Sequence, residues 1–195
     1  MTPAPSRRPT VGCVIVDFTA GSHLVNAVNS VLASGVHEVV VVDNAGDGAS
    51  ATALGKLAQR VHIVEPGRNL GFGAGANRGV AALGEAELVV VANPDVILHD
   101  GALGVLADSL EANPSWGIVG PTILNEAGTR YPSMRQFPNA FDAVGHAMLG
   151  RVWPRNPFTR RYRETDPAPD GTTDWVSGSC LILRRSLFEE LGGFD

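Results

Sequence analysis

An α/β fold with a mainly parallel sheet is the fold class that the sequence predicts, and three observations predict it. Short apolar runs rich in valine alternate along the chain with segments whose apolar residues repeat at helical spacing. These runs are apolar along most of their length, as in strands that helices cover on both faces. Acidic, amide or glycine residues follow several of the runs, at the edge where open α/β sheets bind ligands.

The expected elements can be assigned in order from these patterns. Strands are predicted at 11–18, 38–43, 61–64, 88–92, 117–121 and 175–183, and helices at 22–34, 49–59, 101–112 and 186–191, with a further helix that follows a glycine-rich loop and ends at Leu83. Leu24, Val28 and Val31 give the first helix an apolar face, and Gly35 ends it. A turn is expected at Asn125–Gly128 and less regular structure at 133–173.

The composition fits one soluble domain and limits its function. The 195 residues are 44 % hydrophobic and 18 % charged, which is enough to build a sizeable core. A net charge of −5 argues against a general nucleic-acid binder. No uncharged apolar stretch reaches the roughly 18 residues that a membrane-spanning helix needs. Cys13 and Cys180 lie in apolar runs, where buried reduced thiols are common, so a cytoplasmic location is expected.

Acidic residues end the first two predicted strands. Asp17 ends the first strand, and Asp43 with Asn44 ends the second. Their oxygens can accept hydrogen bonds from a base N–H or a ribose hydroxyl. Such residues at a strand end also form turns or cap helices, so both interpretations stay open for each one alone.

A glycine-rich run, Arg68–Gly79, follows the third strand. Small residues let backbone N–H groups approach phosphate oxygens, and arginine supplies a forked charged donor, so the run predicts a phosphate contact. Tight packing of a helix under a sheet is the alternative. Gly71–Ala76 also matches the fingerprint of NAD-dependent oxidoreductases, but that fingerprint belongs directly after the first strand. Here six residues separate it from Val64 of a third strand.

Asn93-Pro94-Asp95 follows the strand at 88–92. Mg²⁺ and related hard cations take oxygen ligands and are commonly held by one or two carboxylates together with substrate phosphates. Asp95 is therefore the candidate ligand for Mg²⁺ or Mn²⁺, and a plain turn is the alternative.

Taken in order, these motifs resemble family 2 of the inverting glycosyltransferases, most of all its bacterial rhamnosyltransferase branch. The set consists of Asp17, Asp43-Asn44, Asn69–Gly79, Asn93–Asp95, Trp175–Arg185 and Gly192–Asp195, and it extends over nearly the whole chain from Val11. The resemblance implies a GT-A fold, a Rossmann-like sheet flanked by helices. It implies a nucleotide-sugar-binding half at 11–121 and an incomplete acceptor-side half at 122–195. The first ten residues, which contain three prolines and two arginines, are predicted to be a flexible tail.

The resemblance also implies roles for individual residues. The nucleotide would be bound by Asp17, Asp43, Asn44, Arg68, Asn69, Gly71, Gly73, Asn77 and Asn93, the metal ion on the diphosphate by Asp95, and the acceptor would face Trp175, Ser177 and Gly178. Two positions depart from the family pattern. The strand end reads Asp17-Phe-Thr19 where the family more often has Asn-Tyr-Asn, and Asn93 stands in place of the first acid of an aspartate-any-aspartate motif.

The implied reaction transfers a sugar, with rhamnose indicated by the likeness, from a deoxythymidine- or uridine-diphosphate sugar to a glycan or lipid-linked acceptor of the cell envelope. The family's base, a Glu-Asp pair, follows the Gly192–Asp195 motif, where this sequence stops. We therefore assign no catalytic base, interpret the chain as C-terminally truncated, and expect little transfer from it alone. A nucleotide-binding or regulatory module without the base is the alternative.

The segment Arg151–Arg163 holds five arginines and three aromatic residues and no acid. Such a segment suits an anionic membrane surface or a lipid-diphosphate acceptor. Peripheral contact with the inner face of the plasma membrane is therefore a candidate, with a solvated basic loop as the alternative. For Trp175, a place in the core is the alternative to an acceptor contact.

Overall fold

The computed structural model describes residues 7–135, 140–162 and 171–195. The chain folds into two compact units, of which the first contains the residues up to Pro121 together with Gly178–Asp195, and the second contains Thr122–Ser177. The first six residues of the expected tail lie outside the described part. Behind them, Arg7 forms an ion pair with Glu87 at 3.2 Å, and the Thr10 N–H donates to the same carboxylate at 2.8 Å.

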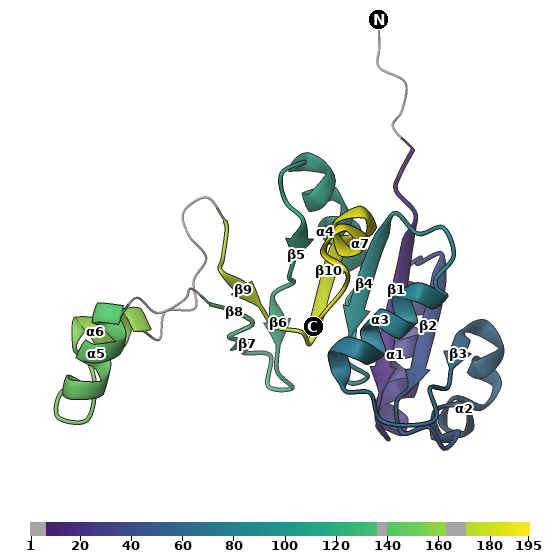
Figure 1. Ribbon diagram of the computed structural model, residues 1–195, viewed down its shortest axis with the longest axis horizontal. Coiled ribbons are helices and arrows are strands. Elements are labelled where there is room, and N and C mark those ends of the chain that lie inside the picture. Colours follow the sequence, from purple (N-terminus) through teal and green to yellow (C-terminus); the bar gives the residue numbers. More distant parts are fainter. Residues whose placement is uncertain (1–6, 136–139, 163–170) are drawn as a thin grey trace, which may run out of the picture. The chain divides into compact units, whose positions relative to one another are not determined.

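A six-stranded sheet forms the centre of the first unit (Figure 1). Its strands, in the order in which they lie side by side, are β3 (His62–Val64), β2 (Glu38–Asp43), β1 (Val11–Asp17), β4 (Leu88–Ala92), β10 (Cys180–Arg184) and β5 (Ile118–Val119). The first four are parallel, and β10 is antiparallel to both of its neighbours. The predicted α/β class with a mainly parallel sheet is confirmed.

Helices pack on both faces of this sheet. They are α1 (Ser22–Ala33), α2 (Ala49–Leu54), a 3-10 helix η1 (Gly55–Arg60), α3 (Phe72–Ala82), α4 (Ala102–Ala112) and α7 (Arg185–Leu191). α1 and α4 share a core with Cys13 and Ile15 of β1. α3 packs on the opposite face, where its Gly79 meets Val14 and Val42, because successive strand residues point to opposite sides.

Three expected elements differ in the structure. The helix predicted at 49–59 turns into η1 at Gly55, whose φ of 52° interrupts α2. The strand predicted at 117–121 is only Ile118–Val119. The single strand predicted at 175–183 is wrong, since a turn separates β9 (Trp175–Val176) from β10, and the two strands join different sheets.

Backbone hydrogen bonds explain this break. The Ser177 N–H donates to the Ser133 carbonyl at 2.7 Å, in the second unit. The Ser179 carbonyl accepts from the Asn93 N–H at 2.8 Å, in the first unit. The small residues Ser177–Ser179 are therefore a crossing between two sheets, although the apolar residues on either side read as one strand.

The second unit contains short strands and two helices. The strands are β6 (Ile123–Leu124) paired with β7 (Arg130–Tyr131), and β8 (Met134–Arg135) paired with β9, and the helices are α5 (Ala140–Leu149) and α6 (Pro157–Tyr162). The turn predicted at Asn125–Gly128 is present, with the Gly128 N–H donating to the Asn125 carbonyl at 2.8 Å. The stretch expected to be less regular thus includes α5 and α6. Nowhere in the described ranges is a helix both long and apolar enough to cross a membrane.

Candidate functional site

The carboxyl ends of the parallel strands bring the predicted polar residues to one edge of the sheet. Asp17 pairs in register with Asp43 on the neighbouring strand. The Asn44 N–H donates to the Asp17 carbonyl at 2.8 Å. Asn93 directly follows β4, the other neighbour of β1. The sequence prediction that these segments converge is therefore met at the level of the backbone.

Ser50 joins the two carboxylates at the base of this edge. Its hydroxyl donates to Oδ2 of Asp17 at 2.7 Å, and its N–H donates to Oδ2 of Asp43 at 3.3 Å. The Oδ1 atoms accept from the N–H groups of Ala20 at 3.0 Å and Gly46 at 3.1 Å. All three linked side chains are buried. Each of the four carboxylate oxygens therefore already accepts a hydrogen bond from the protein, and the two side chains form a fixed, buried floor under this edge.

Asn44 shapes the glycine-rich loop. Its Nδ2 donates to Oδ1 of Asn69 at 3.0 Å and to the Gly71 carbonyl at 3.2 Å. Its Oδ1 accepts from the Leu70 N–H at 2.9 Å. Asn69 in turn accepts the Gly71 N–H at 2.8 Å. Because Asn44 is buried and its amide is engaged on both sides, its place in the site is that of a residue that holds the loop.

The glycines of this loop and helix divide into two groups. Gly75 and Gly79 are buried against the sheet, and a Cβ on Gly75 would lie 3.0 Å from Val16, which is the packing alternative considered for the run. Gly71 is exposed with φ 80°, a conformation that favours glycine, at the amino end of α3. Phosphate contact is thus a candidate role for Gly71 and not for the two packing glycines.

Asn93 and Asp95 lie beside the turn that precedes β10. The Asn93 N–H donates to the Ser179 carbonyl at 2.8 Å, and a Cβ on Gly178 would lie 3.4 Å from the ring of Phe72, the first residue of α3. The start of α3, Asn93 and the predicted acceptor-side Gly178 therefore come together in the first unit, and Asp95 follows Asn93 by two residues. Trp175 and Ser177 belong to the second unit, and Trp175 is 38 % exposed.

The side chains of Arg68 and Asp95 are exposed. Neither side chain forms a hydrogen bond or ion pair with another residue of the described ranges. They are in that respect unlike the buried pair Asp17 and Asp43, and both are free to meet a ligand.

The chemistry of Asp95 fits a cation held mainly by substrate. Across the described residues no three His, Cys, Asp or Glu side chains gather as a metal cage. A single carboxylate oxygen at the ligand-binding edge suits Mg²⁺ or Mn²⁺ when a diphosphate brings further oxygens. The residues present therefore fit this cofactor, with Asp95 as its one candidate protein ligand.

Asn77 fastens the Gly192–Asp195 segment to α3. Its Nδ2 donates to the Phe194 carbonyl and its Oδ1 accepts the Phe194 N–H, both at 2.8 Å. A Cβ on Gly73 would lie 2.9 Å from the carbonyl oxygen of Asp195. Asn77 and Gly73, both predicted to bind nucleotide, thus contact the protein's own backbone in the structure, and ligand contact by either one stays a prediction.

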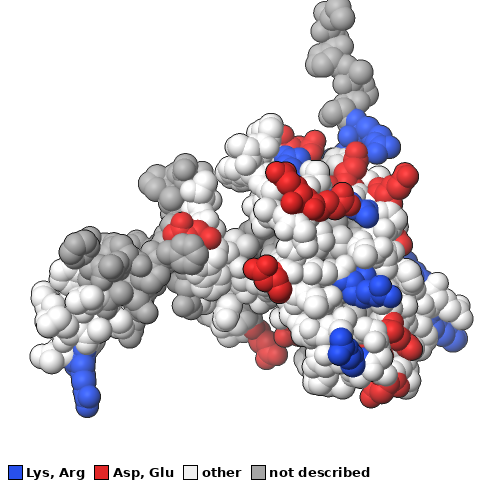
Figure 2. All heavy atoms as spheres, in the orientation of Figure 1, with Lys and Arg blue, Asp and Glu red and all other residues white. Residues whose placement is uncertain are grey.

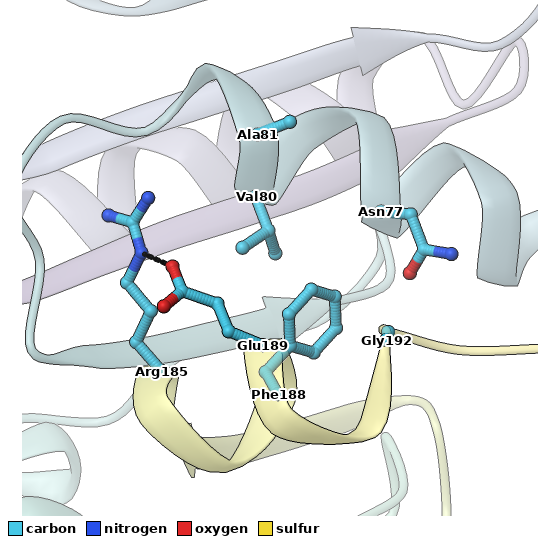
Figure 3. Close-up of a pocket in the computed structure, with 8 residues that line it drawn as sticks. Asn77, Val80, Ala81, Arg185, Phe188, Glu189 and Gly192 are labelled. Carbon is cyan, nitrogen blue, oxygen red and sulfur yellow. Dashed lines mark hydrogen bonds and ion pairs between the residues drawn. The ribbon is translucent and has the colours of Figure 1, made fainter.

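A pocket of about 210 Å³ lies between α3 and α7, where Figure 3 shows Val80 pointing towards the ring of Phe188 and Asn77 near Gly192. Binding pockets for small molecules usually measure about 300–1,000 Å³. Of the predicted site residues only Asn77 lines it. We therefore place the candidate site at the carboxyl edge of the sheet and not in this pocket.

Sequence reasoning missed Ser50 and Phe72 as parts of the site. Ser50 lies in the first turn of a predicted helix, where a serine usually indicates local capping. Its bonds to two strand ends depend on tertiary packing. For Phe72, the glycines on both sides of it were the one sequence feature that indicated close packing at this position.

Known proteins resemble the chain over most of its length. A family model described as glycosyl transferase family 2 matches residues 13–192. An N-acetylglucosaminyl-diphospho-decaprenol L-rhamnosyltransferase of Mycobacterium tuberculosis is 37 % identical over 195 residues, a match that covers 93 % of this chain and 64 % of that protein. An O-antigen biosynthesis protein of Myxococcus xanthus is 32 % identical over 125 residues, covering 61 % of this chain and 9 % of that protein.

Solved structures share the fold. A mannosyltransferase of Pyrobaculum calidifontis, in complex with GDP-Man and Mn²⁺, matches with a TM-score of 0.62 and 21 % identity over 99 % of this chain and 49 % of that one. TarS of S. aureus matches with a TM-score of 0.57 and 13 % identity, over 94 % and 49 %. These likenesses confirm the predicted GT-A type of fold. Since the family model spans residues 13–192, the chain belongs to glycosyl transferase family 2.

Proposed function

We propose that the chain is the donor-binding part of an inverting, metal-dependent glycosyltransferase. It would transfer rhamnose from a deoxythymidine- or uridine-diphosphate sugar to a polyprenyl-diphosphate-linked or other cell-envelope glycan, at the cytoplasmic face of the membrane. One observation carries the proposal: two strand-end carboxylates, the glycine loop that Asn44 holds and the Asn93–Asp95 turn all follow the carboxyl ends of neighbouring strands, at one edge of the sheet. The 37 % identity to the mycobacterial rhamnosyltransferase supports the sugar and the acceptor.

The resemblance to the family supports a contact of the nucleoside with Asp17 and Asp43. Both carboxylates are buried and held by Ser50, so a contact with a base N–H or a ribose hydroxyl requires the loops above them to open when the donor binds. Arg68 and the exposed Gly71 would meet the diphosphate. The arginine would donate a charge-assisted hydrogen bond, and the glycine has no side chain that would keep the diphosphate away from the backbone. Asn44 and Asn69 would act indirectly, because their hydrogen bonds fix the shape of the loop that meets the ligand.

Asp95 would hold the divalent cation on the diphosphate. A cation bound there neutralises the charge that develops on the departing diphosphate. In the proposed transfer an acceptor hydroxyl forms a bond to the anomeric carbon as the bond from that carbon to the diphosphate oxygen breaks. The hydroxyl proton passes to a base that the chain does not identify. A single displacement inverts the anomeric centre.

The acceptor would approach from the side of Gly178 and the Trp175–Ser177 segment. A lipid-linked acceptor lies at a membrane, so peripheral membrane contact, including the basic segment Arg151–Arg163, belongs to this proposal. Arg163 of that segment lies outside the described residues. The division into a donor-binding half at 11–121 and an acceptor-side half at 122–195 is likewise proposed, with β10 and α7 of the latter packed in the first unit.

The proposal predicts that Asp95 is needed for metal-dependent donor binding. We expect deoxythymidine-diphosphate-rhamnose to bind in the presence of Mn²⁺, and Asp95→Asn to weaken binding at least tenfold, because the variant keeps the shape of the side chain and loses its charge. Isothermal titration calorimetry with and without Mn²⁺, repeated with uridine-diphosphate sugars, measures this.

Asp108→Asn is the matched control, since Asp108 is an exposed acid on α4 and should leave the affinity unchanged. Donor binding that is equal in the wild type and in Asp95→Asn would rule out the assigned metal ligand. Binding of NAD in place of any sugar nucleotide would rule out the transferase proposal itself.

A further inference from the structure

We propose that the α5–α6 hairpin docks on an anionic lipid bilayer through one amphipathic surface. This surface, the docking face, consists of Val144, Met148, Val152 and Trp153 together with Arg151 and Arg155. The inference deepens the proposed function, and rests on it only in so far as a lipid-linked acceptor brings the enzyme to a membrane. Its observations come from the second unit alone.

The apolar side chains of the docking face are unusually open to solvent. Val144 is 58 % exposed, Met148 73 %, Val152 86 % and Trp153 56 %. Val144 and Met148 are four residues apart on α5 and so lie on one side of the helix. The Trp153 N–H donates to the Leu149 carbonyl at 2.7 Å, which ties the following turn to the end of α5. Adjacent exposed apolar residues of this size usually mark an interaction surface.

A polar cluster lies between the described side chains of α5 and α6. The ring of His146 lies 3.0 Å from the Thr159 hydroxyl, and Asn156 donates to the same hydroxyl at 2.8 Å. Asn156 and Thr159 are almost fully buried. Gly145 lies against the ring of Phe158.

Among its described side chains, the hairpin thus buries two polar residues and leaves several large apolar residues exposed. Exposed apolar side chains as large as Met148 and Val152 indicate a partner outside the hairpin. The charge of the segment indicates what that partner is.

The hairpin sequence has one acid, Asp142 in the first turn of α5, and from residue 143 to residue 163 it has five arginines and no acid, in a chain whose net charge is −5. Arg151 and Arg155 are exposed and lie within two residues of Val152 and Trp153 in the sequence. In Figure 2 the described part of this hairpin is uncharged or basic, with no acidic side chain in view. Exposed aliphatic residues, a tryptophan and neighbouring arginines are the composition of surfaces that lie in the headgroup region of anionic bilayers.

The test is partition onto acceptor-free vesicles of phosphatidylglycerol and phosphatidylcholine, compared with vesicles of phosphatidylcholine alone. We expect the wild type to sediment with the anionic vesicles and to be released by salt. One arginine near such a surface contributes about a fivefold change in partition, so Arg151→Ala with Arg155→Ala should weaken it about 25-fold. Met148→Glu with Val152→Glu should reduce it at least as much.

Two control variants match these changes on the first unit. Lys56→Ala with Arg60→Ala removes two exposed cations of η1, and Val105→Glu places an acid on an exposed valine of α4. Both should keep wild-type partition. Circular dichroism checks the folding of every variant.

A second readout needs no disruptive variant. Emission of the wild-type tryptophans should shift to shorter wavelength on anionic vesicles, and Trp153→Phe should lose most of that shift. The proposal is overturned if the wild type stays in the supernatant, or if the docking-face variants partition as the control variants do. It is also overturned if the docking-face variants change self-association and leave vesicle partition unchanged. Because the vesicles hold no acceptor and no donor, these outcomes leave the calorimetric test of donor binding untouched.

Discussion

Ser50 is the residue on which the geometry of the two strand-end carboxylates depends. It is fully buried, and it donates through its hydroxyl to Asp17 and through its backbone to Asp43. Loss of the hydroxyl leaves a buried carboxylate oxygen without its donor, which typically costs about 1–3 kcal/mol. The backbone donor to Asp43 would remain.

We therefore expect Ser50→Ala to lower the free energy of unfolding by about 1–3 kcal/mol and to weaken sugar-nucleotide binding as Asp17 moves. Urea denaturation and calorimetry measure the two effects. Ser109→Ala is the control, because that hydroxyl only donates to the Val105 carbonyl within α4. A Ser50→Ala protein as stable as the control would contradict the assigned role.

At this scale the sequence indicated which residues gather but not how each is used. Asp17, Asp43 and Asn44 were placed at one edge from strand-end position alone. Their division into floor and loop holder follows from hydrogen bonds between residues about 25–33 positions apart, and a local pattern carries no information on such pairs. The nucleotide contacts of Arg68 and Asn93 stay predictions.

Among the elements, α3 packs closely on the sheet because glycines stand where the helix meets the strands. A Cβ at Gly79 would collide with Val14 and lie 3.0 Å from Val42. Overpacking of a filled core costs typically about 1–3 kcal/mol, while alanine gains about 1 kcal/mol over glycine in a helix. The clash should prevail at this position.

Gly79→Ala is thus expected to destabilise the protein by about 1–2 kcal/mol. Gly104→Ala gives the matched comparison on α4, where a Cβ would meet nothing within 4 Å, and it should stabilise the protein by up to about 1 kcal/mol. Thermal unfolding of the two variants side by side measures the difference. Equal shifts in the same direction would show that helix propensity, and not close packing, governs α3.

The buried parallel strands were the elements that the sequence predicted best. β2 and β4 have the predicted boundaries, because an all-apolar run with polar residues on both sides leaves little freedom. The break between β9 and β10 was missed since Trp175–Val176 and Cys180–Arg184 are both apolar. Their pairing with different sheets is decided by partners far away in the sequence.

For the molecule as a whole, the two thiols report on the integrity of the sheet. Burial raises the pKa of the Cys13 thiol above its ordinary range and that of the Cys180 thiol to about 11. The thiolate is the reactive form, so both thiols should be inert towards a disulfide reagent in the native protein at pH 8 and should react in guanidinium. Rapid labelling of native protein would contradict the buried assignment.

The same shift predicts a dependence of stability on pH. A pKa that is higher in the folded state means that folding favours the protonated thiol. Its contribution is complete below the unfolded value of roughly 8.5 and declines as the pH rises towards the folded value, about 11 for Cys180. The melting temperature should therefore fall between these two pH values, and by less in Cys180→Ala.

The insertion of β10 between β4 and β5 has a consequence for biosynthesis. A ribosome completes β1, β2, β3 and β4 long before Cys180–Arg184 leaves its exit tunnel. Until then one side of β4, with the run Val89-Val90-Val91, lacks the strand that pairs with it in the finished sheet, and unpaired edges of this kind recruit other chains. The nascent protein thus passes through a period in which chaperone protection matters most, and that period ends when β10 is added to the sheet.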